Sequence, residues 1–530
     1  MAQKSKVFRS NRALGYVTNH IPLVVRYIHR RKEHLVVTSV GKAFHTYGCS
    51  RFTLLSVSDL HSSDITCIGA DHYHIFTASD NIIHAWRRGK ELQHKYIGHQ
   101  YPVHRLLPFG PHLISVDENS NLKIWDIKSE DLHLELTFDI NKFEVTTLIH
   151  PSTYINKILL GSSQGSMQLW NLKSAKLIHV FKGWSSAITV IEQAPAIDVV
   201  AVGLENGRII LHNLKFDEIV MEFMQDWGQV VSLSFRTDGH PILVSGTALG
   251  HIVIWNLEDR KLMCQLLNAH SDSVSGLQCL SNEPLMVTSS SDNALKMWIF
   301  DLPDGGARLL HLREGHGASP SYVRFHGGNG QNLISAGGDS SLRIFSTVTE
   351  TFNKSLGKAS YNRKLSKKKK HQEDPHKMPP VVQFTSEVAR EKEWDNIAAI
   401  HLGLPLVTTW SYHKLKMGDL KLLPERFGNV KCNIVATCVC LTACGNFVVI
   451  GYSSGHVDRF NIQSGMHRGS YGNVAHTGPV RGVATDNLNQ TVVTGGSDAL
   501  IKFWLFRSPG KLLLHSWEHL LLNLSFFRIK

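Results

Sequence analysis

Short apolar segments alternate with small polar turns along almost the whole chain. Nine of them share one arrangement: an apolar run, a turn rich in Ser, Gly, Asp and Asn, and an apolar–polar alternation that ends at an aromatic residue or His. Such turn residues tolerate positive φ, and the alternation is typical of a half-buried strand. The pattern therefore predicts repeated β-hairpins. The final positions are Trp86, Trp125, Trp170, His212, Trp255, Trp298, Phe345, Phe460 and Trp504.

Most neighbouring final positions lie 39 to 47 residues apart. This period is typical of WD40 repeats, in which each unit is a four-stranded blade that buries its apolar face only by stacking on the next blade. We therefore predict an all-β fold of tandem WD40 β-propellers, the first seven-bladed and the second incomplete.

A Gly-His or Ala-His pair precedes several of the hairpins. In WD40 blades this His, the turn Asp and the final aromatic residue form a buried, hydrogen-bonded set, and buried polar groups are tolerated when they are paired. We therefore expect these residues to be structural and not catalytic. The expected sets are His99 with Asp117 and Trp125, His270 with Asp292 and Trp298, His316 with Asp339 and Phe345, and His476 with Asp498 and Trp504.

The repeat also predicts the domain boundaries. About eleven units are present, including a divergent first unit with Tyr47 near the aromatic position, whereas two seven-bladed rings need about fourteen. An open propeller exposes strand edges, so we interpret the chain as truncated or alternatively ended. We expect an N-terminal tail at 1–14, the first propeller at 15–318, the first blade of the second propeller at 319–352, a basic and disordered insertion at 353–395, further blades at 396–507, and a divergent leucine-rich tail at 508–530.

Composition limits the class of partner and compartment. The chain has 56 Lys and Arg against 44 Asp and Glu, a net charge of +12 that favours acidic partners such as nucleic acid. The eight cysteines are too sparse for a disulfide scaffold, and the amino terminus lacks the apolar core of a secretory signal, so we expect a reducing compartment. We expect no membrane span, because no apolar run is long enough.

Two stretches match the G-x-S-x-G pattern of serine hydrolases, at 161–165 and 451–455. A nucleophile elbow is followed by a helix, whereas strand-like segments follow both stretches, so we interpret them as hairpin turns and keep a hydrolase as the weakest alternative. Cys432, Cys438, Cys440 and Cys444 lack the usual spacing of a zinc site and are interpreted as small buried hydrophobes. We expect no catalytic residue, metal, cofactor or small-molecule substrate.

A dense basic run lies in the predicted insertion. Its density fits a nuclear import signal or an electrostatic contact with RNA, and a merely solvated loop is the alternative. We find no aromatic platform or loop for base-specific recognition of RNA. The run consists of Arg363, Lys364, Lys367, Lys368, Lys369 and Lys370.

Four stretches that include non-repeat sequence resemble one family: FRSNRALGYVTNHIPLVVRYI, VTSVGKAFHTYGCSRFTLLSVSD, GHGASPSYVRFHGGNGQNLISAGGDSSLRIFS and AREKEWDNIAAIH. They are similar to the WD-repeat protein thirty-six family. The resemblance spans about residues 7 to 506 and implies two tandem propellers followed by a C-terminal helical domain, which we do not expect within this sequence.

The same resemblance implies a function and a location. It implies a non-enzymatic subunit of the UTP-B complex in the small-subunit processome of the nucleus and nucleolus, with other UTP-B and processome proteins, pre-rRNA and U3 snoRNA as partners. Its expected role is pre-rRNA processing, 18S rRNA maturation and ribosome biogenesis. The alternatives are a cytoplasmic WD40 adaptor in signalling or ubiquitin transfer, and a direct RNA binder.

Overall fold

The structure is a computed structural model that describes residues 12–362, 376–428, 433–507 and the backbone of 511–516. It contains eleven four-stranded antiparallel sheets, and in each the strands pair in the order of the sequence. The short helix α2 spans Glu425–Gly428. The chain divides into two compact units, residues 1–315 and 316–530. Within the described part of the chain, none of the helices has the length and apolar content needed to cross a membrane.

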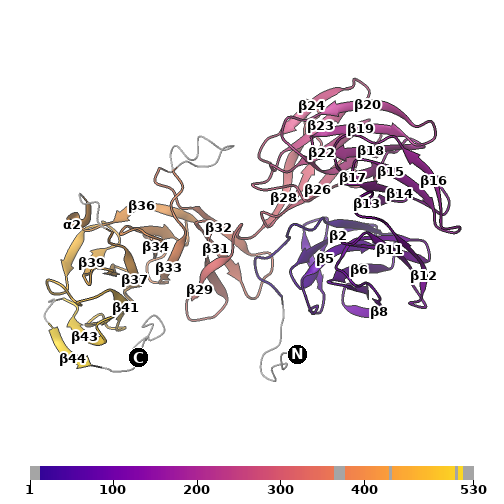
Figure 1. The fold of residues 1–530 in the computed structure, drawn as a ribbon. Helices are drawn as coiled ribbons and strands as arrows, with labels where there is room; N and C mark the ends of the chain where they lie inside the picture. Colours follow the sequence, from indigo (N-terminus) through magenta and orange to yellow (C-terminus); the bar gives the residue numbers. More distant parts are fainter. Residues whose placement is uncertain (1–11, 363–375, 429–432, 508–510, 517–530) are drawn as a thin grey trace. The chain divides into compact units, whose positions relative to one another are not determined.

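Unit 1 contains seven blades, each a meander of four strands (Figure 1). The meander arises because short turns connect strands whose apolar and polar residues alternate. The strands are β1 Val24–Ile28, β2 Glu33–Val40, β3 Ala43–Gly48 and β4 Thr53–Val57 in blade 1; β5 Ile65–Ala70, β6 His74–Ser79, β7 Ile82–Arg87 and β8 Glu91–Ile97 in blade 2; β9 Val103–Phe109, β10 His112–Asp117, β11 Asn121–Asp126 and β12 Leu132–Thr137 in blade 3; β13 Val145–Ile149, β14 Lys157–Ser162, β15 Met167–Asn171 and β16 Lys176–Phe181 in blade 4; β17 Ile188–Gln193, β18 Val199–Leu204, β19 Arg208–Asn213 and β20 Glu218–Met224 in blade 5; β21 Val230–Phe235, β22 Ile242–Thr247, β23 Ile252–Asn256 and β24 Lys261–Leu266 in blade 6; and β25 Gly276–Cys279, β26 Leu285–Ser290, β27 Ala294–Ile299 and β28 Arg308–Glu314 in blade 7.

Unit 2 contains four blades of the same construction. The strands are β29 Pro320–His326, β30 Asn332–Gly337, β31 Ser341–Ser346 and β32 Asn353–Lys358 in blade 8; β33 Val381–Ser386, β34 Ile397–His401, β35 Val407–Ser411 and β36 Lys416–Leu422 in blade 9; β37 Ala436–Leu441, β38 Phe447–Tyr452, β39 Val457–Asn461 and β40 His467–Ser470 in blade 10; and β41 Val480–Thr485, β42 Thr491–Gly496, β43 Leu500–Leu505 and β44 Lys511–Ser516 in blade 11.

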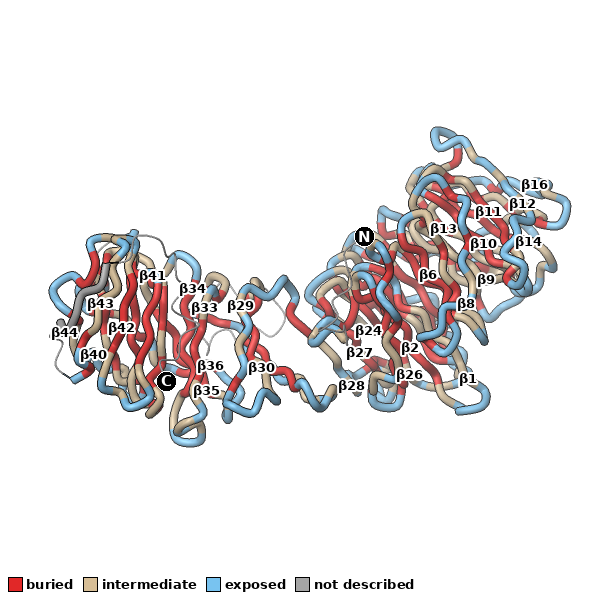
Figure 2. Tube along the Cα trace, turned by 90° about the horizontal axis from the view of Figure 1, so that it is seen from below, coloured by how far each residue is buried: buried red, intermediate tan, exposed pale blue. Residues whose placement is uncertain are grey.

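The cores lie between neighbouring blades, where the inner strands are buried and the outer turns are exposed (Figure 2). One cluster, for example, joins Leu159 and Leu169 of blade 4 to Ile191 and Val202 of blade 5. Each blade therefore depends on its neighbours for burial of its apolar surface. The prediction of an all-β fold of tandem propellers is confirmed.

Contacts between the first and last blades close the ring of unit 1. Strand β1 lies against β25, and the Val25 amide donates a hydrogen bond to Gln278 Oε1 at 3.2 Å. Asn293 of blade 7 accepts from the Val17 amide at 2.7 Å and donates from Nδ2 to the Gly15 carbonyl at 2.8 Å. The segment before blade 1 is thus hydrogen-bonded to blade 7, and the seven-bladed first ring is as predicted.

Unit 2 has four blades in the described chain, consistent with the predicted incomplete second propeller. Its first strand, β29, has two alternate apolar side chains on one face that are largely exposed: Val323 at 60% and Phe325 at 55%. The four described blades leave that face uncovered.

Two predicted boundaries are wrong. The stretch 353–395, predicted as an insertion, contains the last strand of blade 8 and the first strand of blade 9, and the tail predicted from residue 508 contributes β44, which pairs with β43. In β32 only Leu356 is buried, because an outer strand contacts its sheet on one side only. Such a strand lacks the apolar alternation that reveals an inner strand.

Candidate functional site

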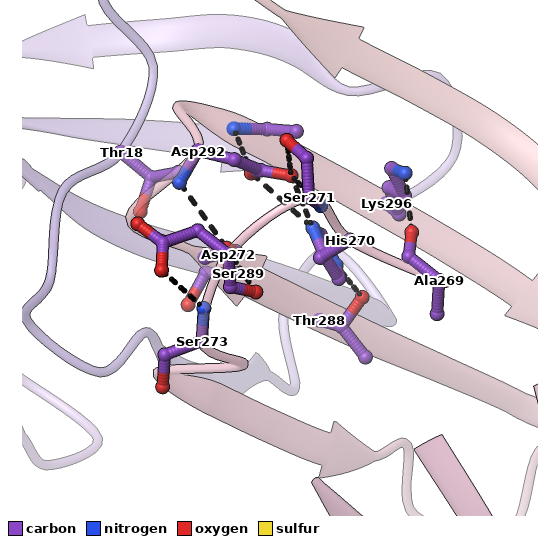
Figure 3. Close-up of polar contacts among 12 residues, drawn as sticks. Thr18, Ala269, His270, Ser271, Asp272, Ser273, Thr288, Ser289, Asp292 and Lys296 are labelled. Carbon is purple, nitrogen blue, oxygen red and sulfur yellow. Dashed lines mark hydrogen bonds and ion pairs between the residues drawn. The ribbon is translucent and has the colours of Figure 1, made fainter. Parts of the chain in front are cut away.

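Blade 7 contains a buried hydrogen-bonded set of four side chains, of which Figure 3 shows His270, Thr288 and Asp292. His270 lies between β24 and β25, Thr288 on β26, Asp292 in the β26–β27 turn, and Trp298 on β27. His270 Nδ1 lies 3.2 Å from Asp292 Oδ2, and Nε2 lies 2.8 Å from Thr288 Oγ1. The indole Nε1 of Trp298 donates to the same Thr288 oxygen at 2.9 Å. The segment that leads into blade 7 is therefore joined to its second and third strands.

The donors and acceptors of this set place a proton on Nδ1 of His270. The Trp298 indole can only donate and the ionised Asp292 can only accept. Nδ1 of His270 must therefore carry the proton towards Asp292. The Thr288 oxygen accepts from Trp298. Because burial lowers the pKa of His270, the imidazole is neutral at pH 7, and its Nε2 accepts from the Thr288 hydroxyl.

The pKa values of the pair agree with this arrangement. Burial lowers the pKa of His270, and its contacts with Asp292 only partly oppose this. Burial alone would raise the pKa of Asp292, but the hydrogen bond and charge of His270 and the Ser271 amide hold it below its ordinary value. That amide donates to Asp292 Oδ2 at 2.9 Å. The carboxylate therefore also orders the turn.

Blades 3 and 11 repeat the same geometry. His99 Nδ1 lies 3.0 Å from Asp117, and His99 Nε2 lies 2.7 Å from Ser115, which accepts from Trp125 at 2.9 Å. In blade 11 the distances are 2.9 Å from His476 to Asp498 and 2.8 Å from His476 to Thr494, and Trp504 donates to Thr494 at 2.9 Å. The structure brings together all three predicted members of each set.

Blade 8 contains a variant of the set. His316 Nδ1 lies 3.4 Å from Asp339, and Nε2 lies 2.6 Å from the Ser335 hydroxyl. Phe345 occupies the aromatic position, and the centre of its ring is 6.2 Å from that of His316. Because a phenyl ring has no N–H, this member contributes by packing alone.

The sets contain two recurring members that were not predicted from the sequence. One is the hydroxyl residue on the second strand of the blade, ten residues before the tryptophan; these residues are Ser115, Thr288 and Thr494. The other is a lysine two residues before the tryptophan that donates to the carbonyl preceding the histidine, as Lys123 does to Gly98 at 2.9 Å. Lys296 and Lys502 make the same bond to Ala269 and Ala475. Both signals were present at a constant spacing from the tryptophan.

The burial and bonding of the sets fit the predicted structural role. Both ring nitrogens of His270 are engaged within the protein, and the residue is only 1% exposed. General-base catalysis requires contact between the base and a substrate. The sets hold the turns and strands of each blade together instead.

The two hydrolase-like stretches are hairpin turns. The hydroxyl of Ser163 donates to Glu144 at 2.8 Å, and that of Ser453 accepts from the Val435 amide at 3.0 Å. Strands β15 and β39 follow them, so neither serine begins a helix. Gly165 has φ +82 and lies against the Trp184 carbonyl, where a side chain would collide. The turn therefore requires a glycine at position 165.

The cysteines examined as a zinc site lie partly in the core. Cys438 and Cys440 are on β37, and burial raises the pKa of the Cys438 thiol to about 12. That thiol is therefore protonated at neutral pH and packs in the apolar cluster between blades 10 and 11. Within the described residues no group of three or more His, Cys, Asp and Glu side chains is placed to hold a metal ion. Cys432 lies outside the described residues.

The predicted basic run also lies outside the described residues. Its members are Arg363, Lys364, Lys367, Lys368, Lys369 and Lys370.

Comparison with known proteins identifies the family. Residues 36–301 match the family model for the WDR36/Utp21 first beta-propeller, and residues 321–527 match that for the second beta-propeller domain. The chain is 50% identical over 514 residues to WD repeat-containing protein 36 of Homo sapiens, covering 97% of this chain and 57% of the human protein. It is 38% identical over 513 residues to the U3 small nucleolar RNA-associated protein 21 homolog of Schizosaccharomyces pombe, covering 95% of this chain and 55% of the relative.

A third relative, U3 small nucleolar RNA-associated protein 21 of Saccharomyces cerevisiae, is 29% identical over 535 residues, covering 97% of this chain and 56% of the yeast protein. The chain thus spans just over half of the length of these relatives. Both units match propellers of one family, in the same order. The chain belongs to the WDR36/Utp21 family.

Proposed function

We propose that this chain is a non-enzymatic scaffold of the small-subunit processome that supports pre-rRNA processing, 18S rRNA maturation and ribosome biogenesis in the nucleolus. The observation that carries the proposal is the match of both units to WDR36/Utp21 propellers, together with fungal relatives named for association with U3 small nucleolar RNA.

The polar chemistry of the blades supports a scaffold over an enzyme. Its most reactive groups, the buried His–Asp pairs, are engaged in holding turns to strands. The serines of the hydrolase-like turns bond to Glu144 and to the Val435 amide. A propeller built this way offers faces and edges for binding other molecules.

Exposed apolar side chains on outer strands support protein partners. In β16, Leu177, Ile178 and Val180 are 44%, 45% and 50% exposed, and in β20, Ile219 is 51% exposed. Contiguous exposed apolar residues are typical of surfaces that bind proteins. We propose other UTP-B and processome proteins as these partners. The basic run from Arg363 to Lys370 adds attraction to pre-rRNA and U3 snoRNA.

Affinity purification tests this function. Tagged full chain is expressed in cells, and co-purifying proteins and RNA are identified. We expect processome proteins and U3 snoRNA, and we expect depletion of the protein to lower 18S rRNA with accumulation of its precursors. A folded chain that retrieves neither, and whose complete depletion leaves precursor levels unchanged, refutes the proposal.

Imaging separates the scaffold from a cytoplasmic WD40 adaptor. A fluorescent fusion of the chain is expected in the nucleolus. A fusion in which Arg363, Lys364 and Lys367 to Lys370 are replaced by glutamine tests whether the basic run is an import signal. Exclusion of the unmodified fusion from the nucleus favours the adaptor.

A further inference from the structure

Exposed basic side chains are concentrated at one end of blades 1 and 2. In an antiparallel four-stranded blade, the turn between the first two strands and the turn between the last two lie at the same end. In these two blades such turns and their flanks contain seven exposed cationic residues: Arg30, Arg31, Lys32, Arg51, Arg87, Arg88 and Lys90. We refer to these seven residues as the basic end.

The corresponding turns of blades 3 and 7 have a different charge. In blade 3 the β11–β12 turn carries Asp126, Glu130 and Asp131 against Lys128. In blade 7 the turns carry Glu283, Asp301 and Asp304. Blade 4 carries Lys173 and Lys176 at this end, so the charge of these turns varies from blade to blade, and the largest number of cations lies on blades 1 and 2.

Direct contacts join the turns of the two blades. The ring centres of His29 in the β1–β2 turn and His72 in the β5–β6 turn are 5.8 Å apart, and Arg26 Nη2 donates to the His72 carbonyl at 3.4 Å. Gly89 in the β7–β8 turn lies directly against the Ser56 hydroxyl of blade 1. The cations therefore belong to one continuous surface.

The turns that carry the cations are internally hydrogen-bonded. The amides of Arg31 and Lys32 donate to the carbonyls of Ile28 and His29, and the Lys90 amide donates to the Arg87 carbonyl. Lys32 and Arg88 both adopt positive φ, at 51° and 54°. The turns thus have an ordered backbone, and binding need not order it.

Nearby carboxylates only partly offset these cations. Asp71 is turned towards its own loop, where it accepts from the Tyr73 and His74 amides. Glu91 is 4.0 Å from Arg88, and both side chains are exposed, so this ion pair is weak. Glu33, at the start of β2, is the third acidic residue of these turns and their flanks. These turns and their flanks thus contain three carboxylates against seven cations, and Glu283 and Glu130 of the neighbouring blades contact His34 and His94.

Exposed rings lie among the cations. Tyr73 is 75% exposed, and His29 and His72 are exposed beside it. Arg-rich surfaces bind phosphates, and exposed rings can stack on unpaired bases. We propose that the basic end binds single-stranded RNA through its phosphate backbone, without base-specific recognition. This inference rests on the proposed function and names a site through which the scaffold contacts RNA.

RNA binding by the purified full chain tests the inference. The probe is a fluorescent single-stranded RNA of about 20 nucleotides and mixed sequence. The test variant is Arg30→Gln/Arg31→Gln/Lys32→Gln. The matched control is Lys173→Gln/Lys176→Gln/Lys215→Gln, which removes the same charge from exposed lysines at the same end of blades 4 and 5. The residues from Arg363 to Lys370 are unchanged in every protein, so their contribution is constant.

We expect the test variant to weaken RNA binding about tenfold at 0.1 M salt and to reduce the slope of log affinity against log salt by about two. The control variant is expected to bind within about twofold of the unmodified chain, because its lysines lie outside the surface. Hydrogen exchange of β1 and β2 verifies that the variant remains folded. Equal losses in both variants, or full binding by the test variant, overturn the inference.

Two further outcomes separate this inference from the proposed function. If the unmodified chain binds no RNA but still co-purifies with processome proteins, the inference fails and the proposed function stands. The second outcome concerns purifications from which ribonuclease has removed the RNA. If the test variant keeps its RNA affinity but retrieves fewer processome proteins than the unmodified chain in them, the basic end binds an acidic protein surface and the RNA inference is wrong.

Discussion

Units 1 and 2 use the same blade but differ in what covers their first strand. In unit 1, Leu23 and Val25 pack with Leu280 and Met297 of blade 7. Val323 and Phe325 occupy the matching positions of unit 2, as their pairing with the second strand shows, and they are largely exposed. Stacking of blades buries every face except the first and last of an array. Ring closure is what buries those two faces.

The largest predicted effect comes from placing a charge at two matching positions, Leu23 of unit 1 and Val323 of unit 2. Leu23→Asp buries a carboxylate between blades 1 and 7 and is expected to destabilise unit 1 by about 4 kcal/mol. Val323→Asp, on the exposed face, is expected to change the stability of unit 2 by no more than about 0.5 kcal/mol. Hydrogen exchange of β1 and β29 in denaturant measures each unit separately. Equal destabilisation of the two units would contradict the comparison.

The next effect tests the hydrogen bonds that close the ring. Asn293→Gly keeps the positive φ of 63° but removes the side-chain bonds to Gly15, Val17 and Thr18. We expect a loss of about 3 kcal/mol from unit 1, measured by denaturant unfolding. Ala499→Gly is the control, because Ala499 has φ 57° at the same turn position in blade 11 and no polar side chain. If both substitutions have the same effect, the Asn293 bonds do not close the ring.

A third prediction concerns acid stability. Burial, with the charges of Arg313 and Arg12, lowers the pKa of His45 in unit 1 to about 4. The unfolded chain therefore takes up the proton first, and stability is lost as pH falls from about 6.5 towards 4. Between pH 7 and 5 this residue accounts for a loss of about 2 kcal/mol.

His45→Gln tests this contribution. Between pH 7 and 5 the stability of unit 1 should fall by about 2 kcal/mol less in the variant than in the unmodified chain. The pH dependence of the stability of unit 2 should not change. An unchanged pH dependence in unit 1 would show that His45 is not held neutral by the fold.

The smallest predicted effect is local and should not depend on ring closure. Trp298→Phe and Trp504→Phe each remove one indole hydrogen bond to a threonine hydroxyl. We expect each substitution to lower the free energy of unfolding of its unit by about 1 kcal/mol. The loss is small because blade 8 accommodates Phe345 at the same position. Thermal unfolding monitored by hydrogen exchange gives both values. A much larger loss in unit 1 would mean that closure and the local sets are coupled.

The sequence predicted the inner part of each blade well. Trp125, Trp298 and Trp504 recur because their slot buries a large ring beside a hydroxyl that the indole N–H can bond, and the His and Asp residues recur because they satisfy each other. The buried ring and the His–Asp pair are each satisfied within a single blade, so these residues recur with the period of the repeat and can be predicted from it.

Features that depend on contacts elsewhere could not be predicted in the same way. Strand β32 is defined by pairing with β31 and has little apolar content. The role of Asn293 depends on Gly15, which lies 278 residues away. The basic end depends on adjacency of turns from two blades, which only the folded ring provides. A repeat pattern describes one blade, and these features belong to the assembly of blades.

The contact between Gly15 and Gly315 has a mechanical consequence. The Gly15 carbonyl lies so close to Gly315 that a side chain at position 315 would collide with it. The chain therefore enters and leaves the ring at one point. Tension applied along the polypeptide is therefore borne by this junction and the Asn293 bonds beside it, and the blades are not stretched. The same proximity would allow a circular permutant: a short linker could join the two ends, and new termini could open in an exposed turn of another blade.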